Sequence, residues 1–155
     1  MMKRWRTFRR LSSFERGVVL EAAGVLLATR VVFQLAGFRR WQRALGFFTP
    51  STKTTGPARA ASDGESARVI ARMEAAAARN IFVRANCLEQ SLVLWWLLRR
   101  RGIDAALRIG GRKESGQFEA HAWVELNGVV LGSNQEHRHF VPFESPVLSM
   151  ETRTE

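Results

Sequence analysis

The stretch RANCLEQSLVLWWLLRRRG spans residues 84–102 and contains the single cysteine of the 155-residue chain. Asn86 and Glu89 have the spacing of a capping box, in which each side chain accepts a hydrogen bond from the other residue's backbone N–H. An apolar pattern at helical spacing follows Cys87, and three arginines and Gly102 then give the signals of a helix end. The sequence therefore predicts a helix with Cys87 in its first turn.

The residues after Gly102 change from helical to alternating spacing. Strands are predicted at Ala105–Ile109, Phe118–Leu126 and Val129–Leu131, with a polar loop over Gly110–Gln117 and a hairpin turn at Asn127 and Gly128. Since helices precede strands, the pattern predicts an α+β fold in which a small antiparallel sheet packs on the helix of Cys87.

The residues before this region divide into a helical arm and a linker. Ser12 and Glu15 have capping spacing, and an apolar helix is predicted from about residue 14 to residue 36, followed by an end or bend at Gly37 and a short amphipathic piece up to residue 48. The polar residues that follow, with Pro50, Gly56 and Pro57, indicate a flexible connection. We therefore expect a basic N-terminal helical arm at 1–48, a linker at 49–64 and a core domain at 65–155.

One further helix is predicted at the start of the core domain. Ser62 and Glu65 repeat the capping spacing, and the apolar positions after them predict a helix that ends near Asn80.

The composition excludes several classes of protein. One cysteine cannot form an internal disulfide, and with three histidines it cannot build a Cys-rich zinc site, so we expect no metal, no cofactor and a reducing cytoplasmic location. Charged residues interrupt the apolar stretch 17–38, which favours a core helix of a soluble protein over a membrane span. Membrane contact is not expected.

Positive charge is concentrated at the N-terminus. Residues 1–48 hold ten Lys/Arg and two Glu, a net charge of 10 − 2 = +8 out of the total of +10. Such an excess could meet nucleic acid, anionic lipid or an acidic peptide, and a solvated basic face accounts for it equally well. Because the chain has no recognised DNA- or RNA-binding motif, no nucleic-acid partner is expected.

Cys87 and His121 are the candidate catalytic pair. A helix N-terminus stabilises a thiolate and presents unpaired N–H groups that can hold a developing oxyanion, although a lone cysteine can also be a small buried apolar residue. His121 lies 34 residues later (121 − 87) in a predicted strand. A cysteine on a helix followed by a histidine on a strand suits Cys–His nucleophilic catalysis.

The hairpin register decides which residue faces His121. A two-residue turn at Asn127 and Gly128 pairs positions that sum to 255 and sets Asn134 across from His121, whereas a three-residue loop with a bulge sets Ser133 there. Either side chain could accept a hydrogen bond from the imidazole. The same residues could also simply end the strand.

The segments RANCLEQSLVLWWLLRRRG, LRIGG and FEAHAWVELNGVVLG, with an arginine-rich start and a long apolar helix before them, resemble the stand-alone leader peptidases of lasso peptide biosynthesis. These are transglutaminase-like cysteine proteases that remove the leader from a ribosomally synthesised peptide precursor. The resemblance covers nearly the whole chain and implies a transglutaminase-like (papain-like) core.

The resemblance also implies residue roles. Cys87 corresponds to the nucleophile and His121 to the general base. The family's third member, usually an aspartate, falls on Ser133 or Asn134, and Asn134 is the residue we predict to orient His121, while Glu136 is the nearest following carboxylate. Since an asparagine cannot stabilise an imidazolium by charge, the alternative is a catalytically impaired binding or scaffold protein in peptide maturation.

Partners follow from the same resemblance. Stand-alone members lack a leader-binding module, which implies a separate leader-recognition protein that delivers the precursor peptide and a macrolactam-forming cyclase that acts afterwards. The basic arm is a candidate docking surface for such a partner or for an acidic leader.

Overall fold

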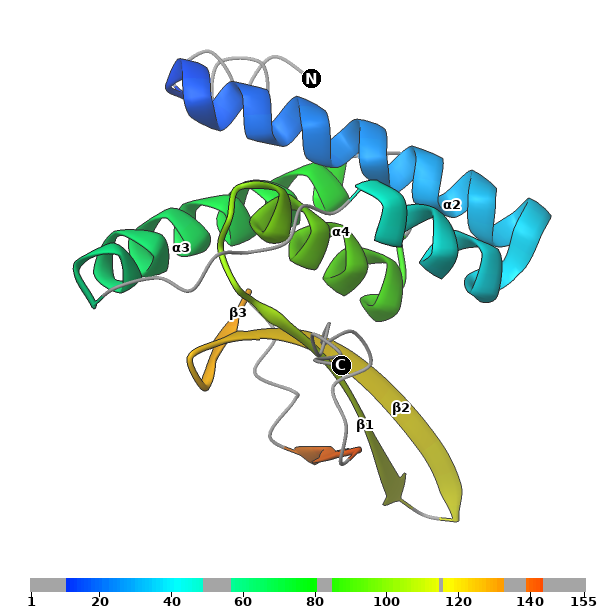
Figure 1. The fold of residues 1–155 in the computed structure, drawn as a ribbon. Helices are drawn as coiled ribbons and strands as arrows, with labels where there is room; N and C mark the ends of the chain where they lie inside the picture. The colour runs from blue at the N-terminus through cyan, green and yellow to red at the C-terminus, as the bar shows by residue number, and fades with distance from the viewer. Residues whose placement is uncertain (1–10, 49–56, 81–84, 115, 133–138, 144–155) are drawn as a thin grey trace, which may run out of the picture.

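The computed structural model describes residues 11–48, 57–80, 85–114, 116–132 and 139–143. Three helices, α2 (Ser13–Phe48), α3 (Pro57–Asn80) and α4 (Cys87–Arg100), precede four strands, β1 (Ala106–Glu114), β2 (Gln117–Leu126), β3 (Val129–Leu131) and β4 (Val141–Pro142). The helices form one layer and the sheet another, with α4 next to the sheet (Figure 1). The predicted α+β fold, with the cysteine-bearing helix on a small antiparallel sheet and a helix before it, is confirmed.

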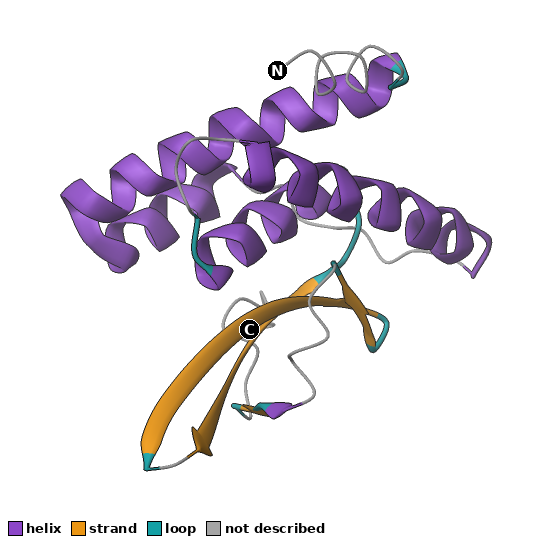
Figure 2. Ribbon diagram, turned by 180° about the vertical axis from the view of Figure 1, so that it is seen from behind, coloured by secondary structure: helices purple, strands orange, loops and turns teal. Residues whose placement is uncertain are grey.

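Helix α4 is buried because it has neighbours on both sides. Its residues from Ser91 to Arg99 are buried, and Leu92, Val93, Leu97 and Leu98 have no exposed surface. A helix that is apolar all round belongs in the interior of a protein. The view from behind shows α4 between the other two helices and the strands (Figure 2).

The sheet has the order β3-β2-β1-β4 and is antiparallel at each pairing. Leu126 pairs with Val129, and Asn127 and Gly128 have φ of 50° and 77°, so the predicted two-residue turn is confirmed and the bulged alternative is wrong. The polar loop predicted over 110–117 is also wrong, because β1 continues to Glu114.

The strand β1 is longer than predicted because its two glycines permit close packing. A Cβ on Gly110 would lie 2.7 Å from the Val141 carbonyl oxygen and 2.8 Å from the Trp123 ring. These glycines, which look like loop residues in the sequence, therefore let β4 and the aromatic side chains approach the sheet.

The helix boundaries differ from the prediction at two places. Helix α2 continues past Gly37 to Phe48 instead of ending there, and its last part, drawn in cyan, turns back on the rest of the helix, in keeping with the predicted bend (Figure 1). Helix α3 begins at Pro57, so Ser62 lies inside the helix and is not its cap, and the helix occupies the last part of the segment 49–64 expected as a linker. Proline is favoured in the first helical turn because its missing N–H would have no helical partner there.

Helix α2 packs against the core through one face. Val18, Ala22 and Leu26 are buried in the same apolar cluster as α4, whereas Leu20, Val31 and Leu35 are exposed. The segment Ser13–Leu35 is long and apolar enough to cross a membrane by length and composition, and 22% of its 18-residue apolar window is buried. Core helices of soluble proteins and signal sequences share these properties, so the expectation of no membrane contact stays a prediction, as does the division of the chain into arm, linker and core.

Candidate active site

Cys87 is the first residue of α4, where the predicted capping box is present. The Glu89 N–H donates to Asn86 Oδ1 at 2.8 Å, and the Asn86 N–H donates to Glu89 Oε2 at 2.9 Å. These bonds satisfy two of the N–H groups at the helix start and leave those of Cys87 and Leu88 without intrahelical partners. The Cys87 thiol is free and half-buried, so it lies beside donors that can hold an anion.

An ion pair with α2 fixes this helix start. Arg30 Nη1 lies 3.0 Å from Glu89 Oε1, and the Glu89 side chain is 3% exposed. The pair neutralises a carboxylate that would otherwise be a buried charge within one turn of the thiol. The N-terminal helix therefore contributes directly to the geometry around Cys87.

A second bond ties α4 to the strand that bears His121. Ser91 lies one turn after Cys87, and its Oγ donates to the Ala122 carbonyl oxygen at 2.8 Å. Because Ala122 is next to His121 in β2, this buried bond fixes the start of α4 relative to the histidine.

Aromatic rings enclose the imidazole of His121, which is 7% exposed. It stacks on Trp123 at 6.2 Å between ring centroids and packs against Phe140 at 5.1 Å. The Trp123 indole in turn donates to Glu125 Oε1 at 2.7 Å. Glu125 therefore positions the ring that stacks on His121.

Cys87 and His121 line one pocket of about 280 Å³. Its other lining residues include Gln90, Ser91 and Leu94 of α4 and Leu131 of β3. No direct hydrogen bond joins these two described residues in this state. Catalytic hydrogen bonds are often long in free enzymes and tighten when substrate binds.

Glu74 of α3 lines the same pocket and is 4% exposed. Its Oε1 has no hydrogen-bond partner within the described ranges. Burial raises the pKa of Glu74 to about 8, against the smaller opposing effect of the Arg79 charge. No motif or spacing in the sequence singles out this glutamate.

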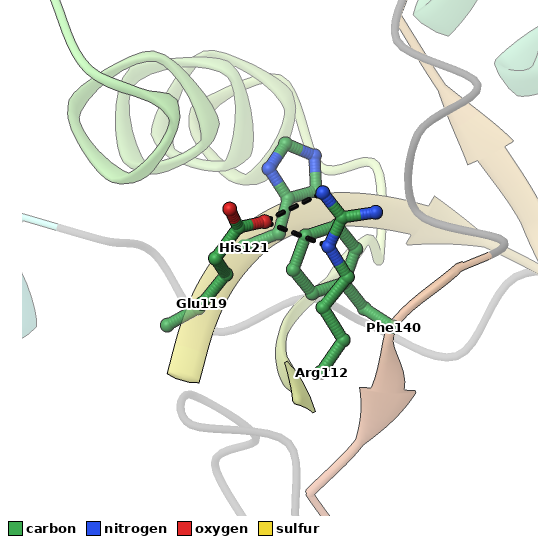
Figure 3. Close-up of a pocket in the computed structure, with 5 residues that line it drawn as sticks. Arg112, Glu119, His121 and Phe140 are labelled. Carbon is green, nitrogen blue, oxygen red and sulfur yellow. Dashed lines mark hydrogen bonds and ion pairs between the residues drawn. The ribbon is translucent and has the colours of Figure 1, made fainter. Parts of the chain in front are cut away.

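A second pocket, of about 500 Å³, is also lined by His121. Arg112, Glu119, Ala120, His121 and Phe140 line it, and their side chains gather at one place on the sheet (Figure 3). Arg112 donates from Nε to Glu119 Oε2 at 2.7 Å, and its guanidinium carbon lies 5.0 Å from the centre of the Phe140 ring. His121 therefore lines both pockets.

The predicted third residue lies outside the described part of the chain. Asn134, Ser133 and Glu136 all fall in the segment 133–138, so the assignment of Asn134 stays a prediction. The confirmed register of β2 and β3 is the one from which Asn134 was expected to face His121. Among described residues, no group of three or more His, Cys, Asp or Glu side chains is arranged to hold a metal ion.

Comparison with protein families gives one match. A family model for the Transglutaminase-like superfamily covers residues 29–145, well over half of the chain, and includes Cys87, His121 and Glu74. No curated protein and no solved structure matches the chain significantly.

Proposed function

The chain belongs to the transglutaminase-like superfamily, which includes cysteine peptidases, and we propose that it removes the leader from a ribosomally synthesised lasso peptide precursor by Cys–His nucleophilic catalysis. One observation carries the proposal: Cys87 at a capped helix start and His121 on β2 line the same pocket although 34 residues separate them (121 − 87). The motifs around both residues, which resemble the leader peptidases, supply the substrate class.

The reaction would proceed through a thioester. His121 takes the thiol proton as Cys87 Sγ attacks the carbonyl carbon of the bond between leader and core, and the helix-start N–H groups stabilise the oxyanion. His121 then gives the proton to the leaving amine as the C–N bond breaks. Water, deprotonated by His121, hydrolyses the thioester and restores the thiol.

Asn134 remains our proposed orienter of His121. An asparagine can accept a hydrogen bond from one ring nitrogen and hold the other toward the thiol, as the asparagine of papain-like enzymes does. A Cys–His–Asn site lacks the charge of the usual aspartate, so it should be slower than a site with a carboxylate. Asn134→Asp is therefore expected to raise the turnover, and Asn134→Ala to lower it.

The missing carboxylate also supports a second candidate, a binding or scaffold protein that retains the fold. The two functions differ in the behaviour of the thiol. A peptidase should form a covalent acyl-enzyme on Cys87, whereas a scaffold should bind the precursor without reacting with it.

Cleavage of a precursor peptide from the gene's own neighbourhood tests the proposal. The wild-type protein, with a leader-recognition protein added, should release leader and core as two fragments seen by mass spectrometry. Cys87→Ala and His121→Ala should release neither, and Ser62→Ala, an exposed change on α3, should cleave normally. Normal cleavage by Cys87→Ala would exclude Cys87 as the nucleophile.

The partners and the location are part of the same proposal. A separate recognition protein would deliver the leader, a cyclase would receive the core, and all would act in the cytoplasm. The arm's charge of +8 (10 − 2) supports docking there. Replacing Arg39, Arg40 and Arg43 by glutamate should weaken the complex in a pull-down, and unchanged binding would refute the docking site.

A further inference from the structure

Glu74 is a buried polar group that the reaction above does not use. It lies on α3 among Ile70, Ala71, Met73 and Ala77, which belong to the apolar core, and it is 4% exposed. Its Oε1 has no hydrogen-bond partner in the part of the chain that the structure describes. A buried, unpaired polar atom destabilises a protein, and such atoms are rare in native structures.

The position of Glu74 indicates a use for this destabilising buried group. Together with Cys87 of α4 and His121 of β2, it lines the pocket of about 280 Å³, so three elements contribute reactive or polar groups to one cavity. Where a polar group costs stability and faces a binding pocket, a ligand that completes its hydrogen bonds recovers that cost.

The protonation state indicates the kind of ligand. Burial raises the pKa of Glu74 to about 8, so near neutral pH the carboxyl group is mostly protonated. A protonated carboxyl group has one O–H donor and one carbonyl acceptor. One residue of an extended peptide backbone offers the matching pair on one side, its own C=O acceptor and N–H donor, whereas the C=O and N–H of a single trans peptide group point in opposite directions. An uncharged carboxyl group also does not repel an approaching thiolate.

We propose that Glu74 is a substrate-binding residue whose carboxyl group hydrogen bonds the backbone of the bound peptide beside the bond that Cys87 attacks. This inference rests on the proposed function and adds a residue to its site. In this role Glu74 contacts the substrate itself and does not position Cys87 or His121, and the two roles predict different results with the two probes below.

Two alkylating probes test the role independently of the natural precursor. Iodoacetamide reports the reactivity of the Cys87 thiol alone, and acetyl-Ala-Ala-Gly chloromethyl ketone adds a peptide backbone that must fit the pocket. The second-order rate constant for each probe is measured by mass spectrometry for the wild type, Glu74→Leu, Glu74→Gln and the control Glu65→Gln, an exposed change on the same helix.

Glu74→Leu should react with the peptidyl probe about tenfold more slowly than the wild type, the effect of one lost neutral hydrogen bond. Its rate with iodoacetamide should stay within about twofold of the wild-type rate. Glu74→Gln, which keeps a donor and an acceptor, should retain most of the peptidyl rate, and Glu65→Gln all of it. Both Glu74 variants should melt at a higher temperature than the wild type, which also shows that they fold.

The outcomes separate the inference from the function on which it rests. If Glu74→Leu reacts with the peptidyl probe at the wild-type rate, the inference is overturned. If Glu74→Leu loses the same factor in rate with both probes, Glu74 acts on the thiol, and the inference is overturned as well. A wild-type Cys87 that reacts with iodoacetamide but not with the peptidyl probe overturns the proposed function, and the inference falls with it.

Discussion

The buried carboxyl group of Glu74 should make the protein less stable as the pH rises. Its pKa is raised from 4.5 to about 8 in the folded protein, mainly by burial. Between these values the folded chain holds a proton that the unfolded chain has lost, so the free energy of unfolding falls with increasing pH. Arg79 on the same helix opposes the shift, and Cys87 and His121 are the titratable groups across the pocket.

The size of the effect follows from the shift. Each pKa unit corresponds to about 1.4 kcal/mol, so raising the pH from 5.5 to 8 should cost up to about 3 kcal/mol through Glu74. Glu74→Gln removes the titration and leaves His121, Cys87 and Arg79 in place. The difference in unfolding free energy between Glu74→Gln and the wild type should therefore grow over this pH range.

Urea unfolding at pH 5.5, 6.5, 7.5 and 8, followed by tryptophan fluorescence, measures that difference. The free energy of unfolding of Glu74→Gln minus that of the wild type should rise by about 1 kcal/mol per pH unit, close to the limit that linkage sets for a single proton. Glu65→Gln, an exposed change on the same helix, should run parallel to the wild type. If the Glu74→Gln curve also runs parallel, the carboxyl group is not buried in the way the structure describes.

Three further substitutions test contacts around the site. Arg30→Met leaves the buried Glu89 carboxylate without its cation. It should lower the free energy of unfolding by about 2 kcal/mol, less than for a fully buried pair because the Arg30 side chain is 36% exposed. A melting temperature equal to that of the exposed change Arg68→Met would contradict this. Ser91→Ala removes the hydrogen bond to the Ala122 carbonyl. It should lower the free energy of unfolding by about 1–2 kcal/mol and slow the alkylation of Cys87 by the peptidyl probe. If neither the stability nor the alkylation rate changes, the bond does not hold the site. Gly110→Ala would place a Cβ 2.8 Å from the Trp123 ring and should lower the free energy of unfolding by about 1–3 kcal/mol. Gly24→Ala, whose Cβ would have nothing within 4 Å, should be neutral or stabilising. Equal effects of the two substitutions in urea unfolding would refute the close packing.

Local signals in the sequence predicted local structure well. The capping spacings at Ser12/Glu15 and Asn86/Glu89 are confirmed by reciprocal hydrogen bonds, because a capping box depends only on residues three apart. The same spacing at Ser62 failed because the helix already begins at Pro57, where the fixed φ of proline suits a first turn.

Long-range contacts could not be predicted in the same way. Glu74 has the sequence appearance of an ordinary surface glutamate, and only the packing of α3 against α4 and the sheet buries it. The bond from Ser91 to Ala122 joins residues 31 apart, and Gly110 belongs to a strand because Trp123 and Val141 close on it. Each depends on tertiary packing, which periodicity does not encode.

The proposed function requires His121 to activate the Cys87 thiol across their shared pocket. The test is the rate at which iodoacetamide alkylates Cys87 at pH 7 in the wild type and in His121→Ala, with far-UV circular dichroism used to check that the fold is retained. The variant should react at least tenfold more slowly, in line with the usual contribution of a general base (about 10²–10⁴). Equal rates in the two folded proteins would contradict it.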